Sequence, residues 1–190
     1  MYKTPSILLL TLVLSSFTVS AMEIEGIDIP DTLSVPNSGT TLVLNGAGIR
    51  KKFFMNIYIG ALYLESRTED ARTILDGTGP ASVMMHFLYD EVSKDKITDG
   101  WIDGLEKNTS HEEMQALEER LTQFNKLFRT VHKGDVIRID YLPEAGTQVR
   151  INGEWRGTVA GNDFFHALLS IWLGENPVTR SLRNNMLGRQ

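Results

Sequence analysis

Residues 41–65 carry the most informative hydrophobic pattern of the chain. Residues 41–44 and 53–64 are rich in β-branched, aromatic and other apolar side chains, which predicts two long strands. Both alternating faces of the second strand are mostly apolar, as is typical of a strand in the middle of a sheet that is covered on both sides. We expect Gly46 and Gly48 to form the bend that joins the two strands.

One face of the second predicted strand is a candidate lining for a ligand pocket. Strict alternation puts Phe54, Asn56, Tyr58, Gly60 and Leu62 on this face. The missing side chain at Gly60 would leave a gap beside the polar tips of Asn56 and Tyr58. We therefore expect this face to look into a cavity.

The rest of the chain mixes strand and helix patterns. Strands are predicted at residues 81–89, 136–142, 147–151 and 154–159, and helices at residues 68–76, 93–107, 110–128, 163–172 and 179–187. In the second of these helices Ile97, Trp101 and Leu105 repeat every four residues, and Gly100 permits close approach of a neighbour. Runs of strands, runs of helices and antiparallel hairpins indicate an α+β domain, with helices packed on a mainly antiparallel sheet.

The first 21 residues have the features of a secretory signal peptide. Lys3 gives a basic start, residues 7–14 form an apolar run, and residues 19–21 have the small-residue pattern of a cleavage site. The apolar run is shorter than the roughly 20 residues of a membrane-spanning helix. We expect cleavage after Ala21, export to the periplasm or beyond, and a single mature domain at residues 22–190.

Composition excludes several classes of function. The chain has 190 residues, 19 basic and 24 acidic side chains, and a net charge of −5. This sign is unfavourable for a protein whose main partner is a phosphate backbone, so we expect no nucleic-acid partner. The absence of cysteine excludes disulfides, a thiol nucleophile and thiolate metal sites, so stability must come from packing.

Two short motifs resemble cofactor or metal sites but lack necessary residues. Gly46 and Gly48 have no third glycine, and a predicted strand follows them instead of the helix N-terminus that would receive a phosphate. His111 and Glu112 begin like a zinc-protease helix, but Gln115 stands where the second histidine ligand belongs. We expect neither a cofactor nor a metal.

Arg50 is the strongest candidate for ligand chemistry. It follows the two glycines at the start of the predicted strand, where its guanidinium could bind a carboxylate through two parallel hydrogen bonds. The alternative is an arginine that lies along the sheet edge with its charge in water. The residues alone leave both interpretations open.

Two segments of the chain resemble the chalcone isomerase-like family, especially its secreted bacterial branch. The first is Leu-Asn-Gly-Ala-Gly-Ile-Arg at residues 44–50 with the strand that ends Ala-Leu-Tyr-Leu-Glu at residue 65; the second is residues 165–178. The resemblance implies an open-faced β-sandwich, in which a large antiparallel sheet is covered by helices and a ligand cleft lies between them. The family includes plant chalcone isomerases, which cyclise chalcones, and non-catalytic relatives that bind fatty acids.

The resemblance also implies roles for individual residues. The family's arginine matches Arg50, which would guide the substrate oxyanion in an enzyme or hold the carboxylate in a fatty-acid binder. Enzyme positions that carry a threonine, a tyrosine and an asparagine match Tyr58, Ser93 and Gly100, so none of those side chains is reproduced. A further polar position on the late helix falls at Ile171, or at Ser170 after a shift of one residue.

We therefore expect an exported, non-catalytic binder of a fatty acid or a similar amphipathic carboxylate. The candidate ligand-binding residues are Arg50, Asn56, Tyr58, Leu62, Trp101, Leu105 and Ser170.

Two alternatives remain. One is an isomerase, an intramolecular lyase acting on a chalcone-like phenolic enone, with Arg50 and Tyr58 as catalytic residues. The other is an envelope interaction module without a small-molecule ligand, in which Tyr58 packs against Trp101 and leaves no cavity beside Arg50.

Overall fold

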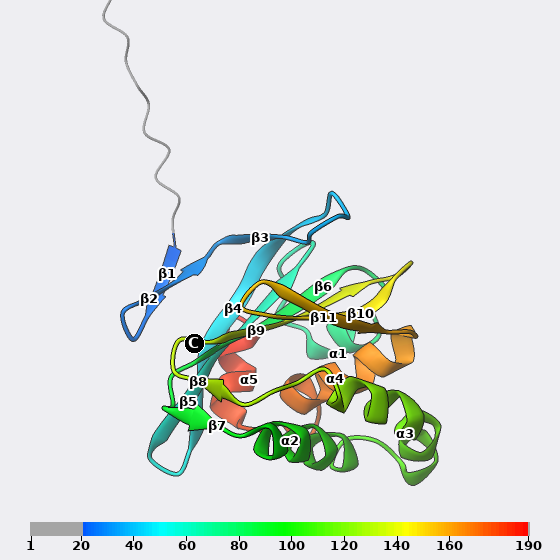
Figure 1. Cartoon of the computed structure of the whole chain (residues 1–190). Helices are drawn as coiled ribbons and strands as arrows, with labels where there is room; N and C mark the ends of the chain where they lie inside the picture. Colours follow the sequence, from blue (N-terminus) through cyan, green and yellow to red (C-terminus); the bar gives the residue numbers. More distant parts are fainter. Residues whose placement is uncertain (1–20, 190) are drawn as a thin grey trace, which may run out of the picture.

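The computed structural model describes residues 21–189, and its centre is a seven-stranded antiparallel sheet (Figure 1). The predicted signal peptide falls almost wholly outside the described residues. From one edge to the other, the strands are β11 (Glu154–Val159), β10 (Gly146–Ile151), β9 (Val136–Leu142), β6 (Ala81–Phe87), β5 (Met55–Leu64), β4 (Thr41–Lys52) and β3 (Thr32–Ser34). Two small ribbons pair β1 (Ala21–Ile24) with β2 (Ile27–Pro30), and β7 (Glu91–Val92) with β8 (Val131–His132).

Five helices gather on one side of this curled sheet (Figure 1). They are α1 (Ala71–Leu75), α2 (Lys94–Glu106), α3 (His111–Asn125), α4 (Asn162–Leu173) and α5 (Arg180–Met186). The main core lies between helices and sheet, and a second buried cluster covers the opposite face with residues from β2 to β6. The prediction of an α+β domain with helices on a mainly antiparallel sheet is confirmed.

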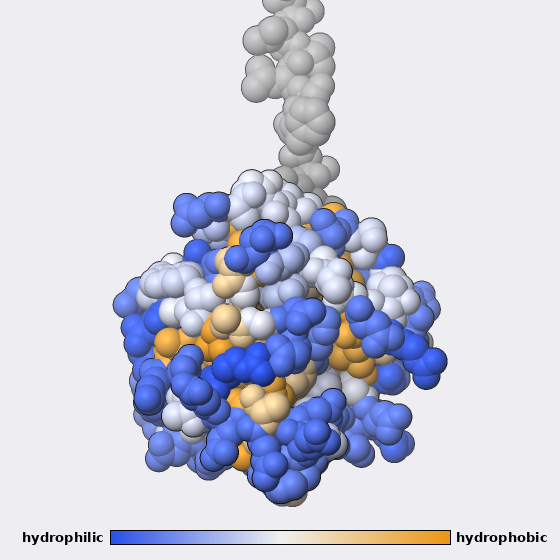
Figure 2. All heavy atoms as spheres, turned by 90° about the vertical axis from the view of Figure 1, so that its right-hand side faces the viewer, coloured by the Kyte–Doolittle hydropathy of each residue, from blue (hydrophilic) through white to orange (hydrophobic). Residues whose placement is uncertain are grey.

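The β5 strand is buried on both faces, as its composition predicted. Tyr58, Leu62 and Leu64 belong to the helix-side core, whereas Ile59 and Tyr63 belong to the opposite cluster. Seen from the right-hand side of Figure 1, hydrophilic side chains cover most of the surface and apolar ones show only as small patches (Figure 2). Within residues 21–189, no helix combines the length and the apolar character needed to cross a bilayer.

The two glycines of β4 do not form the bend that the sequence suggested. Gly46 and Gly48 lie within the strand, and the turn to β5 is formed by Phe53 and Phe54, since Lys52 pairs with Met55. The glycines instead let α5 approach, because a Cβ atom at Gly46 would collide with the backbone of α5. The close backbone approach is therefore to the C-terminal helix.

A bulge in β5 reverses the expected alternation of its side chains. Arg50 pairs with Tyr58, but Lys51 pairs with Asn56, so Ile57 has no partner on β4. As a result Ile57 and Tyr58 both join the helix-side core. Asn56 instead donates a hydrogen bond to Glu25 in the β1–β2 turn at 3.3 Å, away from the face on which we expected it.

Candidate ligand-binding site

A small cavity lies between β5 and helix α2, with Arg50 at its edge. Its volume is about 60 Å³. It is lined by Arg50, Ile57, Tyr58, Met85, Phe87, Val92, Lys96, Ile97, Gly100, Trp101, Ile171 and Val178. The fold thus brings together Arg50, Tyr58 and Trp101, three of the residues that the sequence analysis proposed as ligand-binding.

The Arg50 side chain reaches this cavity from β4 because the strand register puts it opposite Tyr58. Its Cζ atom lies 5.6 Å from the centre of the Tyr58 ring, within the range of a cation–π contact. The Nε atom is buried and has no hydrogen-bond partner among the described residues. A buried guanidinium N–H without an acceptor is costly, and a ligand oxygen would remove that cost.

Tyr58 is held in place from the helix side. Its hydroxyl oxygen accepts a hydrogen bond from the indole Nε1 of Trp172 on α4 at 2.9 Å, and only 4% of the residue is exposed. Burial raises the pKa of Tyr58, and the charge of Arg50 and the indole hydrogen bond offset only part of that increase. The phenol therefore remains protonated at neutral pH and is available as a hydrogen-bond donor.

Trp101 supplies a second unpartnered donor. Its indole ring packs in an aromatic cluster, with ring centres 5.9 Å from Trp172 and 5.3 Å from Phe128. The Nε1 atom is buried and, within residues 21–189, has no hydrogen-bond partner. Two of the unpartnered buried polar atoms, Arg50 Nε and Trp101 Nε1, thus belong to residues that line one cavity.

The polar side chains that line the cavity are hydrogen-bond donors, and none of them is a carboxylate. Arg50, Lys96, Tyr58 and Trp101 provide N–H and O–H groups, and no aspartate or glutamate is among the lining residues. Such a site favours a ligand group that carries negative charge and accepts hydrogen bonds. In the part of the chain that the structure describes, no three acidic or histidine side chains are grouped so that they could hold a metal ion.

The cavity adjoins a wider groove with a volume of about 520 Å³. The two spaces share the lining residues Arg50, Ile57, Val92, Lys96 and Gly100. A Cβ atom at Gly100 would meet nothing within 4 Å, so α2 leaves open space at this position. The groove extends to the β4–β5 turn, and its other lining residues are Lys52, Phe53, Met55, Tyr89, Glu91, Asp99 and Asp103.

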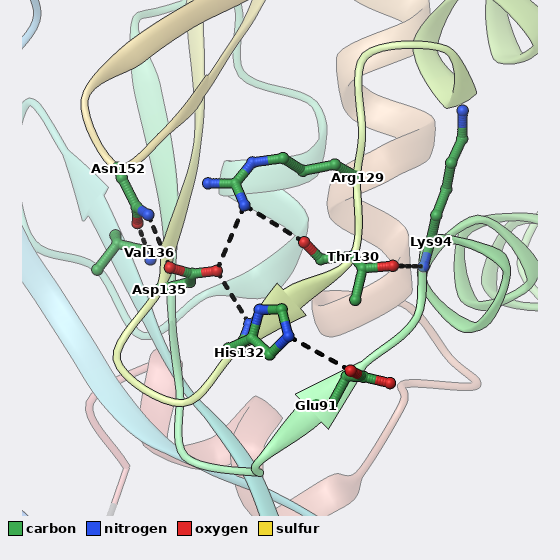
Figure 3. A network of polar contacts seen from close by, with 8 residues as sticks. All are labelled: Glu91, Lys94, Arg129, Thr130, His132, Asp135, Val136 and Asn152. Carbon is green, nitrogen blue, oxygen red and sulfur yellow. Dashed lines mark hydrogen bonds and ion pairs between the residues drawn. The ribbon is translucent and has the colours of Figure 1, made fainter.

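A polar network fixes the wall of the groove that contains β7 (Figure 3). The Asp135 carboxylate accepts hydrogen bonds from the His132 backbone at 2.9 Å and from Asn152 Nδ2 at 2.7 Å. Burial alone would raise the pKa of Asp135, but these hydrogen bonds and the Arg129 charge hold it below its usual value. His132 also pairs with Glu91 at 3.3 Å, which ties β8 to β7.

The remaining predicted site residues lie elsewhere. Leu62 and Leu105 are completely buried in the core and do not line the cavity. Ser170 donates a hydrogen bond to the Ala167 carbonyl at 2.6 Å and borders a separate surface groove. Its neighbour Ile171 lines the cavity instead, because the helix turns the two side chains about 100° apart.

Lys96 is a lining residue that the sequence analysis did not single out. It lies one helical turn before Gly100, the position at which the sequence indicated close approach of a neighbour. The same four-residue spacing could have identified Lys96 as a rim residue.

Comparison with known proteins agrees with this fold. A family model described as chalcone isomerase-like matches residues 21–188, so the resemblance is confirmed. The fold is similar to the crystal structure of a fatty-acid binding protein from Arabidopsis thaliana, with a TM-score of 0.62 and 15% sequence identity. The match covers 82% of this chain and 95% of the plant protein. Among curated protein sequences no match was found.

Proposed function

Because the chain belongs to the chalcone isomerase-like family, we propose that it binds a fatty acid or a similar amphipathic carboxylate beside Arg50. The observation that carries this proposal is a cavity lined by hydrogen-bond donors and apolar side chains, with two buried N–H groups unpartnered. A carboxylate accepts hydrogen bonds through both oxygens and carries the charge that an arginine favours.

In this proposal Arg50 Nε and the Tyr58 hydroxyl donate to the carboxylate. Tyr58 keeps its hydrogen bond from Trp172, because a phenol oxygen can accept one bond while its proton is donated to another group. A hydrogen bond to a charged group contributes about 1.5–3 kcal/mol. Trp101 Nε1 is available as a further donor.

The alkyl chain would occupy the adjoining groove. The inner cavity of about 60 Å³ has room for about two water molecules and is too small for an acyl chain. The groove of about 520 Å³ falls within the roughly 300–1,000 Å³ of small-molecule sites. Its apolar wall is formed by Ile57, Met55 and Val92, which would contact the methylene groups.

Similarity to a plant fatty-acid binding protein supports this choice of ligand class. We also propose export through the signal peptide at residues 1–21, to the periplasm or outside a bacterial cell. The mass of the mature protein purified from its host would test the export proposal. A chain that begins at Met22 is the expected result, and a chain that begins at residue 1 would contradict it.

Chalcone chemistry is the second candidate, because the same donors would stabilise a phenolate or enolate oxygen. The raised pKa of Tyr58 keeps its phenol protonated at neutral pH, so Tyr58 could not take the proton from such a substrate and would act only as a hydrogen-bond donor. A panel of chalcones tests this alternative, and turnover above the uncatalysed rate would favour it. The interaction module without a ligand is disfavoured, because a cavity lies beside Arg50.

Calorimetric titration with oleate tests the proposed function. In Arg50→Ala we expect affinity to fall by about tenfold or more, since a charge-assisted hydrogen bond is lost. Arg72→Ala is a matched control, because Arg72 is an exposed arginine on α1 outside the cavity and the groove. Equal affinity in wild type and Arg50→Ala would contradict the proposal.

A steric variant gives a second test at the same site. Gly100→Leu places a side chain in the open space between cavity and groove, and leucine is a better helix former than glycine. We expect oleate binding to fall while the free energy of unfolding is unchanged or increases. Unchanged binding in Gly100→Leu would show that the ligand lies elsewhere.

A further inference from the structure

The turn between β4 and β5 exposes two adjacent phenylalanines. Phe53 and Phe54 are 84% and 94% exposed, whereas the other exposed large apolar residues, Met22 and Trp155, are 42% and 51% exposed. Lys52 pairs with Met55, so the two aromatic residues make up the entire turn. In Figure 1 this hairpin extends at the lower left, beyond β7.

The backbone of this turn does not favour a phenylalanine. Phe53 has a φ of 55°, a left-handed conformation that glycine and asparagine adopt readily and bulky residues avoid. Neither ring is buried, so the aromatic pair does not stabilise the core. Packing in the core therefore does not explain the two phenylalanines.

The same hairpin is positively charged in an acidic protein. Between residues 32 and 64 the sequence contains three basic side chains, Arg50, Lys51 and Lys52, and no aspartate or glutamate. Lys51 and Lys52 are exposed and directly precede the two phenylalanines. The acids that border the neighbouring groove, Glu91, Asp99 and Asp103, belong to β7 and α2, and two of them are paired with His132 and Lys107.

We propose that residues 51–54, which we call the hairpin tip, dock the protein on a bilayer that contains anionic phospholipid. Phenylalanine side chains insert at the boundary between lipid headgroups and acyl chains, and lysines next to them are attracted by anionic lipid headgroups. The tip matches this partner, because two exposed rings follow two exposed lysines. Its Lys52 and Phe53 also line the groove, so docking would bring the groove opening to the lipid surface.

Flotation with lipid vesicles tests this proposal without any ligand. The purified protein should bind vesicles of phosphatidylcholine with phosphatidylglycerol, bind much less to phosphatidylcholine alone, and be released by high salt. Lys51→Glu with Lys52→Glu should reduce binding by roughly fivefold or more for each lysine changed. The matched control is Arg72→Glu with Lys126→Glu, the same charge change at exposed residues of α1 and of the end of α3 that line neither the cavity nor the groove, which should retain binding.

The aromatic pair is tested by Phe53→Asn with Phe54→Ser. Asparagine suits the left-handed position, so this variant should fold as wild type does and lose binding to anionic vesicles. In Phe54→Trp, bromine-labelled lipids should quench tryptophan emission more than they do in wild type. Equal binding by wild type and the aromatic variant, equal binding to both vesicle types, or no added quenching would overturn the proposal.

The vesicle result is independent of the proposed function. Lys51→Glu and Phe54→Ser change tip residues that do not line the groove, so in each of these single variants the affinity for monomeric oleate should remain near that of wild type. Lost vesicle binding with retained oleate binding supports docking by the tip. Loss of oleate binding in Arg50→Ala concerns the cavity alone.

Discussion

Two arginines on opposite faces of the sheet have very different surroundings. Arg138 donates from Nε to both oxygens of the completely buried Asp140 at 2.8 and 2.9 Å, and Ser82 donates to the same carboxylate at 2.7 Å. Arg50 faces an aromatic ring and a cavity, and its buried Nε is unpartnered within the described residues.

The difference separates a structural polar cluster from a binding site. The Arg138 cluster satisfies its donors and acceptors within the protein, so its contribution is to the stability of the native state. At the Arg50 site a buried donor has no acceptor within the described residues, so the site stabilises the fold less than it would with an acceptor present. Such an arrangement is expected where a bound ligand supplies the acceptor. A change in the Arg138 cluster should therefore lower the stability of the protein and leave ligand affinity unchanged. A change at Arg50 should lower ligand affinity and affect stability little.

The largest expected effect on stability is that of Asp140→Asn. This change removes the negative charge that pairs with Arg138. Breaking a buried ion pair in this way costs about 3–5 kcal/mol, and we expect a loss of about 3 kcal/mol because the Arg138 side chain keeps some contact with solvent. Urea denaturation measures the loss. Oleate affinity of the folded variant should match that of wild type, and a stability change below about 1 kcal/mol would remove the contrast between the two arginines.

Arg50→Ala should have the opposite profile. Loss of the cation–π contact with Tyr58 costs about 0.5–1 kcal/mol, and removal of the unpartnered Nε offsets part of that cost. The free energy of unfolding should therefore change by less than about 1 kcal/mol while oleate affinity falls about tenfold or more. A variant that loses stability as Asp140→Asn does would make Arg50 a structural residue.

Tyr58→Phe should have an intermediate effect on both properties. The Trp172 N–H would be left buried without its acceptor, which costs about 1–2 kcal/mol of stability. Loss of the phenol donor should weaken oleate binding by roughly fivefold, the equivalent of about 1 kcal/mol. Tyr89→Phe is a control in the groove, and identical behaviour of the two variants would argue against a specific role for the Tyr58 hydroxyl.

The smallest expected effect is that of pH on ligand binding. The raised pKa of Tyr58 keeps its phenol protonated, so oleate affinity should be nearly constant between about pH 6 and pH 9. A bell-shaped dependence in this range would contradict binding by a phenol that stays protonated.

Stability has a different pH dependence, which follows from the same tyrosine. The pKa of Tyr58 is higher in the folded protein than its value of about 10 in the unfolded chain. Below about pH 10 the phenol is protonated in both states and its full contribution to stability is present. Above that pH the unfolded chain loses the proton first, so the free energy of unfolding falls. Thermal unfolding between pH 8 and pH 11 should therefore show a decrease only above about pH 10, and the decrease should be smaller in Tyr58→Phe.

Local sequence rules predicted the elements of the fold well. A helix was predicted from residue 110, where Ser110 and Glu113 form a capping box at the start of α3. Strands were predicted at residues 147–151 and 154–159, where β10 and β11 pair through a left-handed turn at Asn152 and Gly153. The double-sided apolar pattern of β5 correctly indicated a central strand. These features depend on neighbours within a few residues, which a single sequence displays.

Features set by distant contacts could not be predicted in the same way. Gly46 and Gly48 resembled a bend because nothing nearby in sequence announces α5, which packs on them from more than 130 residues away. The bulge at Ile57 moved Asn56 to the other face, since strict alternation holds only while the register is regular. Trp101 lines the cavity with Arg50 and Tyr58, and Leu105 lies in the core. The two α2 residues share one helical face, so the helical period alone could not distinguish them.

A crystal structure of the protein with oleate would locate the ligand directly. We expect the carboxylate within hydrogen-bond distance of Arg50 Nε and the Tyr58 hydroxyl, with the alkyl chain in the groove beside Gly100. A carboxylate bound elsewhere, with the cavity beside Arg50 closed by protein side chains, would contradict this expectation.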